Sequence, residues 1–189
     1  MSQAARAAAA LTGAILLSSP GVIGGLEIGA IAPEFGMTTL QGRRFSLAEA
    51  ERTHGGVVIL FLSTTCPYSN YYNDLIRDLA GEFTKRGILF VGVNSGSLET
   101  AEEARAHARE HGHAFDIIKD PDSRIAELLD ARRTPEVFLL DSRGTLRYHG
   151  RIASKISAPD LKSAIEAFLA GQPIRPAETK AFGCAIPRR

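Results

Sequence analysis

The chain has 189 residues, of which 44% are hydrophobic and 23% are charged, and its formal net charge is +1 at pH 7. This length suits one domain with a full hydrophobic core, and this composition excludes a disordered chain. The balanced charge gives no indication of nucleic-acid binding, and two distant cysteines form neither the framework of a disulfide-stapled miniprotein nor the close-spaced pairs of a structural zinc site.

The first segment, residues 1–27, is predicted to be a leader. Its apolar stretch, residues 7–19, follows Arg6 and precedes several small residues, which is typical of a signal peptide. The stretch is too short to cross a bilayer, so we expect no stable membrane span. We therefore expect export to the periplasm or another extracytoplasmic compartment, where cysteines can cycle through a disulfide. The alternative is an ordinary N-terminal helix in a cytoplasmic protein.

Strands and helices alternate through residues 28–171, which we expect to form one domain. Three continuous apolar runs are typical of strands buried on both faces, and this alternation implies an α/β fold with a largely parallel core sheet. A tail, residues 172–189, is rich in proline and expected to be extended. In chain order, we predict a strand or hairpin within residues 29–44, a helix starting at 46, a strand at 57–62, a helix at 70–86, a strand at 88–93, a helix at 100–111, a strand at 115–118, a helix at 122–129, strands at 137–140 and 146–148, and a helix at 157–170.

Cys66 lies at the junction between the first apolar run and the helix that follows it. At a helix N-terminus, unpaired backbone N–H groups and the helix dipole favour a thiolate over a thiol. The thiolate is the nucleophilic form of cysteine. The sequence therefore predicts redox chemistry of this sulfur, and the alternative is a buried structural cysteine.

Four short segments carry a family resemblance. Residues 32–35 (Ala-Pro-Glu-Phe), the turn at 66–69 (Cys-Pro-Tyr-Ser) and residues 133–136 (Arg-Thr-Pro-Glu) together resemble the redoxin, or AhpC/TSA, branch of the thioredoxin-like superfamily. The tail, residues 176–186, is similar to the ending of a peroxiredoxin-like subgroup of redoxins. The resemblance implies a thioredoxin-like fold, in which helices flank a central mixed β-sheet in a single domain, and it implies a thiol-based oxidoreductase.

The resemblance implies roles for individual residues around the nucleophile Cys66. Thioredoxins carry a second cysteine where this chain has Ser69, whose hydroxyl can donate a hydrogen bond to a thiolate but cannot resolve a mixed disulfide. Cys184, on a tail expected to be mobile, is the candidate resolving thiol, and a static Cys66–Cys184 bond or a buried tail anchor are the alternatives. The other expected site residues are Ser63 and Thr65, which would stabilise the thiolate, and Thr134 and Pro135, which match the cis-proline position.

The peroxidase pattern of the superfamily is incomplete in this chain. Ser63 matches its hydroxyl position, but Ile59 stands where that pattern has proline and Pro135 where it has arginine. The neighbouring Arg132 and Arg133 are expected to lie on the surface. We therefore favour thiol–disulfide exchange over a peroxiredoxin-like peroxide reductase. A non-catalytic binding module on a redoxin scaffold is a further alternative.

The expected partners follow from this chemistry. They are a thiol or disulfide substrate, with peroxide as the alternative, and an external thiol reductant such as glutathione. We expect no cofactor and no metal. His107, His111 and His113 cluster near a helix end, where a solvated cluster that suits the helix dipole is favoured over a metal site.

Overall fold

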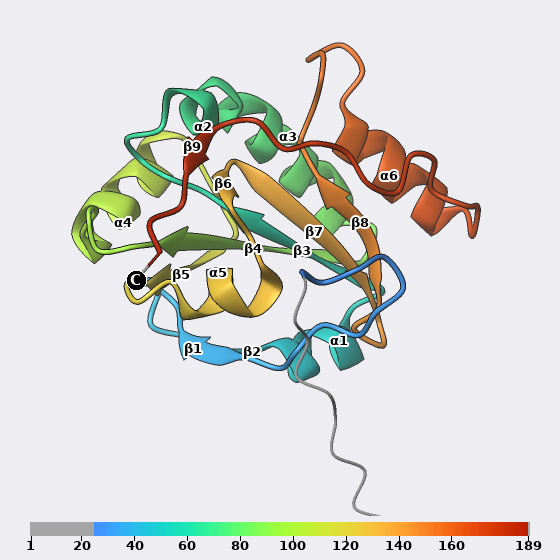
Figure 1. Cartoon of the computed structure of the whole chain (residues 1–189), viewed down its shortest axis with the longest axis horizontal. Helices are drawn as coiled ribbons and strands as arrows, with labels where there is room; N and C mark the ends of the chain where they lie inside the picture. The colour runs from blue at the N-terminus through green and yellow to red at the C-terminus, as the bar shows by residue number, and fades with distance from the viewer. Residues whose placement is uncertain (1–24, 189) are drawn as a thin grey trace, which may run out of the picture.

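The computed structural model describes residues 25–188 of the chain, so the predicted leader lies almost wholly outside the described residues. Its centre is a five-stranded mixed sheet in the order β5-β4-β3-β7-β8 (Figure 1). β3, β4 and β5 are parallel, whereas β7 is antiparallel to β3 and β8 is antiparallel to β7. The bounds of these strands are Gly56–Phe61 (β3), Ile88–Ser95 (β4), Asp116–Asp120 (β5), Glu136–Asp141 (β7) and Leu146–Gly150 (β8).

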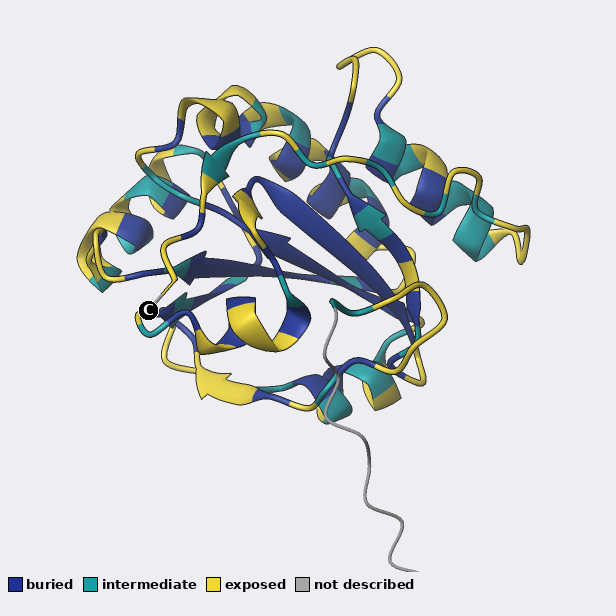
Figure 2. Cartoon of the chain, in the orientation of Figure 1, coloured by how far each residue is buried: buried dark blue, intermediate teal, exposed yellow. Residues whose placement is uncertain are grey.

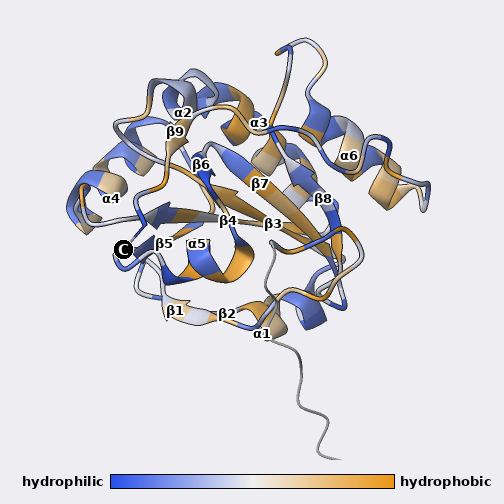
Figure 3. Cartoon of the chain, viewed as in Figure 1, coloured by the Kyte–Doolittle hydropathy of each residue, from blue (hydrophilic) through white to orange (hydrophobic). Residues whose placement is uncertain are grey.

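The continuous apolar runs form the middle of this sheet, as predicted. Every residue of β3 and β7 is buried, and Figures 2 and 3 show both strands as buried and hydrophobic. The register places Ile59 beside Val91 on one side and Phe138 on the other. The strands are apolar on both faces because helices cover both faces of the sheet.

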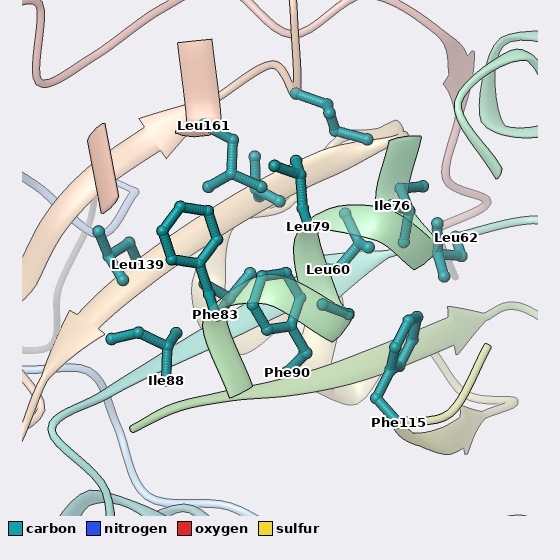
Figure 4. Close-up of a cluster of buried hydrophobic side chains, with 14 of the residues drawn as sticks. Leu60, Leu62, Ile76, Leu79, Phe83, Ile88, Phe90, Phe115, Leu139 and Leu161 are labelled. Carbon is teal, nitrogen blue, oxygen red and sulfur yellow. The ribbon is translucent and has the colours of Figure 1, made fainter. Parts of the chain in front are cut away.

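Two hydrophobic clusters fill the space between the sheet and these helices. The first, which contains Leu60, Phe83 and Leu161, lies between the sheet and helices α3, α4 and α6 (Figure 4). The second, which contains Ile59 and Leu129, lies between the opposite face and helices α1 and α5. The helices are Leu47–Thr53 (α1), Pro67–Tyr71 (α2), Asn73–Thr84 (α3), Ala101–Glu110 (α4), Arg124–Leu129 (α5) and Asp160–Leu169 (α6).

The helix predicted at 70–86 differs from the observed structure. It is two helices, α2 and α3, separated by Tyr72, whose backbone (φ −101, ψ 4) is not helical. The Tyr72 hydroxyl donates a hydrogen bond of 2.9 Å to the carbonyl oxygen of Ala153, which fixes this residue to the loop before α6. The first of the two helices, α2, begins directly after Cys66.

Two small sheets complete the described fold. β1 (Gly36–Thr38) and β2 (Arg44–Ser46) form the hairpin expected near the start of the domain. β6 (Arg133–Thr134) pairs antiparallel with β9 (Cys184–Ala185), a pairing that the sequence did not predict. The tail that leads to β9, red in Figure 1, runs across the molecule from α6 past α3 to the region of α2. Among residues 25–188, no helix has both the length and the apolar character needed to cross a membrane.

Candidate functional site

Cys66 caps the N-terminus of α2, in the place that the sequence predicted. The residue is only 1% exposed, so its sulfur is covered by neighbouring chain. In its thiol form it donates a hydrogen bond of 3.0 Å to the carbonyl oxygen of Thr134. The Thr134–Pro135 peptide bond is cis, as the family resemblance implied. The structure thus brings Cys66 together with Thr134 and Pro135 from two distant parts of the chain.

Cys184 lies at the same place. In the pairing of β9 with β6, Cys184 stands directly opposite Thr134, whose carbonyl oxygen contacts Cys66. Both cysteines are free, and each thiol shifts the pKa of the other. The tail therefore does not have to travel to deliver its sulfur, because its docked position already places Cys184 beside Cys66.

The two thiols differ in acidity. Burial by itself raises the pKa of the Cys66 thiol, but hydrogen bonds from the Cys184 side chain and the Ser69 backbone N–H outweigh burial and lower that pKa. The pKa of Cys184 is raised to about 11, first because its thiol donates to the Cys66 sulfur and then because of burial. Cys66 is thus the sulfur that ionises first, and Cys184 is the neighbour that keeps its proton.

The role of Cys184 as a hydrogen-bond donor can be tested with two substitutions of similar size. Cys184→Ala removes the donor, whereas Cys184→Ser keeps a hydroxyl that can donate. We expect the pH profile of Cys66 alkylation to move to higher pH in the alanine variant relative to the serine variant, because the thiolate has lost a donor. The measurement is the rate of iodoacetamide labelling of the single remaining thiol against pH. Identical profiles in the two variants would contradict the assignment.

The hydroxyls of Ser63, Thr65 and Ser69 lie near Cys66 in the sequence but bond other groups than the Cys66 sulfur, and the Thr65 hydroxyl donates to Glu99. The Ser63 hydroxyl oxygen accepts a hydrogen bond of 3.1 Å from the backbone N–H of Cys66. The Ser69 hydroxyl oxygen accepts one of 3.2 Å from the backbone N–H of Ser63, and it is the backbone N–H of Ser69 that favours the thiolate. These contacts shape the loop that holds Cys66.

Glu99 is the site residue that sequence reasoning missed. Its buried carboxylate, 7% exposed, accepts hydrogen bonds from the Ser63 and Thr65 hydroxyls, from the backbone N–H of Thr64 at 2.8 Å and from the amide of Asn94 at 2.6 Å. Burial alone would raise the pKa of Glu99, but these hydrogen bonds lower it to about 2. A charged carboxylate therefore ties the loop before Cys66 to the end of β4.

A lysine completes the support of this carboxylate. The ammonium group of Lys119 on β5 donates to the side-chain oxygen of Asn94 at 2.6 Å, which leaves the Asn94 amide nitrogen to face Glu99. Burial lowers the pKa of Lys119, and the nearby charge of Glu99 opposes that effect. Glu99, Asn94 and Lys119 share one sequence signal, which is that each lies at or shortly after the end of a predicted strand. The carboxyl ends of parallel strands meet at one edge of the sheet.

A cavity of about 230 Å³ opens beside the cis-proline. Tyr68 of α2, Pro135, Ile152 and Phe182 of the tail contribute to its walls. Tyr68 and Phe182 are both more than half exposed, so aromatic surface reaches solvent next to the covered nucleophile. The cavity is a candidate place for the group attached to a reacting sulfur.

The remaining predicted residues lie apart from this chemistry. Arg132 pairs with Asp130 at 2.7 Å, and Arg133 donates to the carbonyl oxygen of Gly183 at 3.3 Å. His107, His111 and His113 do gather, with ring centroids 4.4 to 6.2 Å apart. Within residues 25–188, no group of three or more histidine, cysteine or acidic side chains is arranged to hold a metal ion.

Comparisons with known proteins identify the family and the fold of this chain. A family model described as the AhpC/TSA family matches residues 28–149. The thiol-disulfide oxidoreductase ResA of Geobacillus thermodenitrificans is 24% identical over 141 residues, which cover 75% of this chain and 78% of that protein. The thioredoxin-like protein YneN of Bacillus subtilis is 27% identical over 124 residues, which cover 65% of this chain and 71% of that protein.

Solved structures share the fold. A protein of Sinorhizobium meliloti superposes with a TM-score of 0.80 at 26% identity, over 88% of this chain and 97% of that one. A protein of Chlorobium tepidum, provisionally assigned as the thiol:disulfide interchange protein DsbE, superposes with a TM-score of 0.68 at 20% identity, over 77% of this chain and 99% of that one. The predicted thioredoxin-like fold, with helices on both faces of a mixed sheet, is confirmed.

Proposed function

This chain belongs to the AhpC/TSA family, and on that premise we propose that it is a thiol–disulfide oxidoreductase with Cys66 as nucleophile and Cys184 as resolving thiol. One observation carries the proposal. Two free thiols meet at Thr134: Cys66 donates to its carbonyl oxygen, Cys184 stands opposite it across the β6–β9 pair, and the two pKa values are shifted in opposite directions. A static disulfide and a tail anchor would not need a nucleophile of lowered pKa.

The reaction has three stages: the first two are single thiol–disulfide exchanges, and the third comprises two exchanges through a mixed disulfide with the reductant. The Cys66 thiolate attacks a substrate disulfide, which forms a mixed disulfide and releases one substrate thiolate. This leaving thiolate takes the Cys184 proton, and the Cys184 thiolate then attacks the Cys66 sulfur, which forms a Cys66–Cys184 bond and releases the second thiolate. An external dithiol, or two equivalents of a thiol such as glutathione, reduces that bond and is itself oxidised to a disulfide.

Two further features support this assignment over the alternatives. The relatives named above are thiol-disulfide oxidoreductases or thioredoxin-like proteins. The peroxidase pattern is incomplete, because Ile59 stands where that pattern has proline and Pro135 stands where it has arginine. We also propose an extracytoplasmic location, which rests on the signal-peptide pattern of residues 7–19.

The proposal is tested by mapping the cysteines after one oxidation. The reduced protein receives one equivalent of bis(2-hydroxyethyl) disulfide and is digested without reductant, and its peptides are identified by mass spectrometry. We expect a Cys66–Cys184 crosslink in the native protein and a Cys66–hydroxyethyl adduct in Cys184→Ser. A Cys66 adduct with Cys184 free in the native protein would make this an enzyme with one working cysteine. Two untouched thiols would favour a binding module instead.

A further inference from the structure

The edge of β6 beside Cys66 is occupied in this structure. A strand edge next to a nucleophile exposes backbone N–H and C=O groups on which an extended polypeptide can pair. Here Arg133 and Thr134 already pair with Ala185 and Cys184 of the same chain. Glu136 fixes this edge, because its buried carboxylate accepts the backbone N–H groups of Arg132 and Arg133, each at 2.7 Å. The tail thus stands where the backbone of a polypeptide substrate would lie.

The tail is held on both sides of Cys184. After it, the side chain of Ile186 is 5% exposed within the second hydrophobic cluster, and its N–H donates to the carbonyl oxygen of Arg132 at 3.0 Å. Before it, the backbone of Thr179 donates to the carbonyl oxygen of His149 at 2.9 Å, and its hydroxyl lies 2.7 Å from that of Tyr148. A segment fastened at both ends is not displaced by a weakly bound polypeptide.

Two glycines allow the backbone of the tail to pack closely against the sheet. Gly183 has φ +158, and a Cβ atom there would lie 2.0 Å from the carbonyl oxygen of Thr134. Gly150 on β8 has φ +139, and a Cβ atom there would lie 2.0 Å from the carbonyl oxygen of Thr179. Backbone of the tail therefore approaches the sheet edge more closely than any residue with a side chain allows.

The remaining opening is small. The cavity of about 230 Å³ beside Pro135 is smaller than the roughly 300–1,000 Å³ of a usual small-molecule pocket. Phe182 of the tail forms one of its walls, so the cavity in this form depends on the docked tail. Neither cysteine lines this cavity, so it lies next to the covered Cys66 sulfur, and its size suits a compact group attached to a reacting sulfur.

From these observations, which rest on the proposed function, we infer that the docked tail restricts Cys66 to low-molecular-weight disulfides. β9 pairs with β6 where the strand of a polypeptide substrate would pair, and Cys184 lies where the cysteine of that substrate would lie. A small disulfide reaches Cys66 beside Tyr68 and Pro135 after a slight movement of the tail. A polypeptide disulfide needs the whole of β9 to leave.

The test compares two symmetric disulfides on the full-length reduced protein. One is bis(2-hydroxyethyl) disulfide, and the other joins two copies of an unstructured peptide through central cysteines. The rate of Cys66–Cys184 crosslink formation with each disulfide is divided by the rate at which the same disulfide reacts with N-acetylcysteine. This normalised rate corrects for the intrinsic reactivity of the disulfide. We expect the small disulfide to be favoured by at least about a hundredfold, because the peptide reacts only through the rare open form. Equal normalised rates would overturn the inference and leave the proposed function intact, whereas no crosslink with either oxidant would overturn both.

A substitution of Gly183 tests whether the docked tail, rather than some general effect on the protein, sets this preference. Gly183→Ala forces the tail away from Thr134, and it is expected to raise the ratio of the peptide-disulfide rate to the small-disulfide rate roughly tenfold, because any effect on the two thiols themselves is common to both oxidants. Gly81→Ala is the control, because a Cβ atom at Gly81 of α3 meets no atom within 4 Å. In a Cys184→Ser background, Gly183→Ala should also speed labelling of Cys66 by a bulky maleimide more than by iodoacetamide. An unchanged ratio of the two reagents would count against the tail as the barrier.

Discussion

Replacing Cys66 by serine is expected to lower the turnover of bis(2-hydroxyethyl) disulfide by at least about 10³-fold. A serine hydroxyl stays protonated near neutral pH, so the variant lacks the anionic nucleophile that the first step requires. The change is small in volume at a site that is only 1% exposed, and Cys66 makes no side-chain cap hydrogen bond that serine would lose. The measurement is consumption of the disulfide with glutathione as reductant, together with circular dichroism to verify the fold.

Cys184→Ser provides the matched control for this experiment. It should still react once with the disulfide and accumulate a mixed disulfide on Cys66, because only the second step needs Cys184. The two single variants therefore separate attack from resolution. Turnover within about tenfold of the native rate in Cys66→Ser would assign the chemistry to another group.

Replacing Glu99 by glutamine is expected to cost about 3 kcal/mol of unfolding free energy. The hydroxyls of Ser63 and Thr65, the backbone of Thr64 and the amide of Asn94 all donate to this carboxylate. A glutamine has one acceptor oxygen and an NH₂ group that would face some of these donors. The measurement is urea unfolding of both proteins at neutral pH. Glu102→Gln on the exposed surface of α4 is the control and should leave the unfolding midpoint nearly unchanged.

The same carboxylate makes a pH prediction with a definite sign. The pKa of Glu99 is about 2 in the folded protein and near 4.5 when the side chain is free, so the folded state favours the charged form. Its contribution is fully present above pH 4.5 and is lost as the pH falls from 4.5 towards 2, at most about 3 kcal/mol. The difference in stability between native protein and Glu99→Gln should therefore shrink over this range. A constant difference would show that the charge of Glu99 is not what stabilises the loop.

Local sequence patterns predicted much of the fold for identifiable reasons. Continuous apolar runs marked β3, β4 and β7 because these strands are buried on both faces. The helix predicted at 100–111 is α4, and Thr100 and Glu103 form a capping box at its start with both reciprocal hydrogen bonds present. The position of Cys66 at the start of a helix followed from the change from an apolar run to a helical pattern.

The features that the sequence did not predict are non-local. Glu99 directly precedes the capping box and has no local feature that distinguishes it from a surface acid, because its partners come from the loop after β3 and from β4. The pairing of Cys184 with Thr134 joins two-residue strands that are far apart in sequence and have no periodicity. The tail was expected to be mobile because it is rich in proline, but buried Ile186 and close backbone contacts hold it in place.

The docking of β9 on β6 links the stability of the fold to the oxidation state of the two sulfurs. Because the folded chain holds Cys184 beside Cys66, it raises their effective concentration far above that in an unfolded chain. A bond between them would close a loop of more than a hundred residues, which in the chain-entropy model stabilises the fold by on the order of 4–5 kcal/mol. By reciprocity, the fold stabilises that bond by the same free energy. The oxidised enzyme is therefore the more stable form, and its reductant must supply the difference on every cycle.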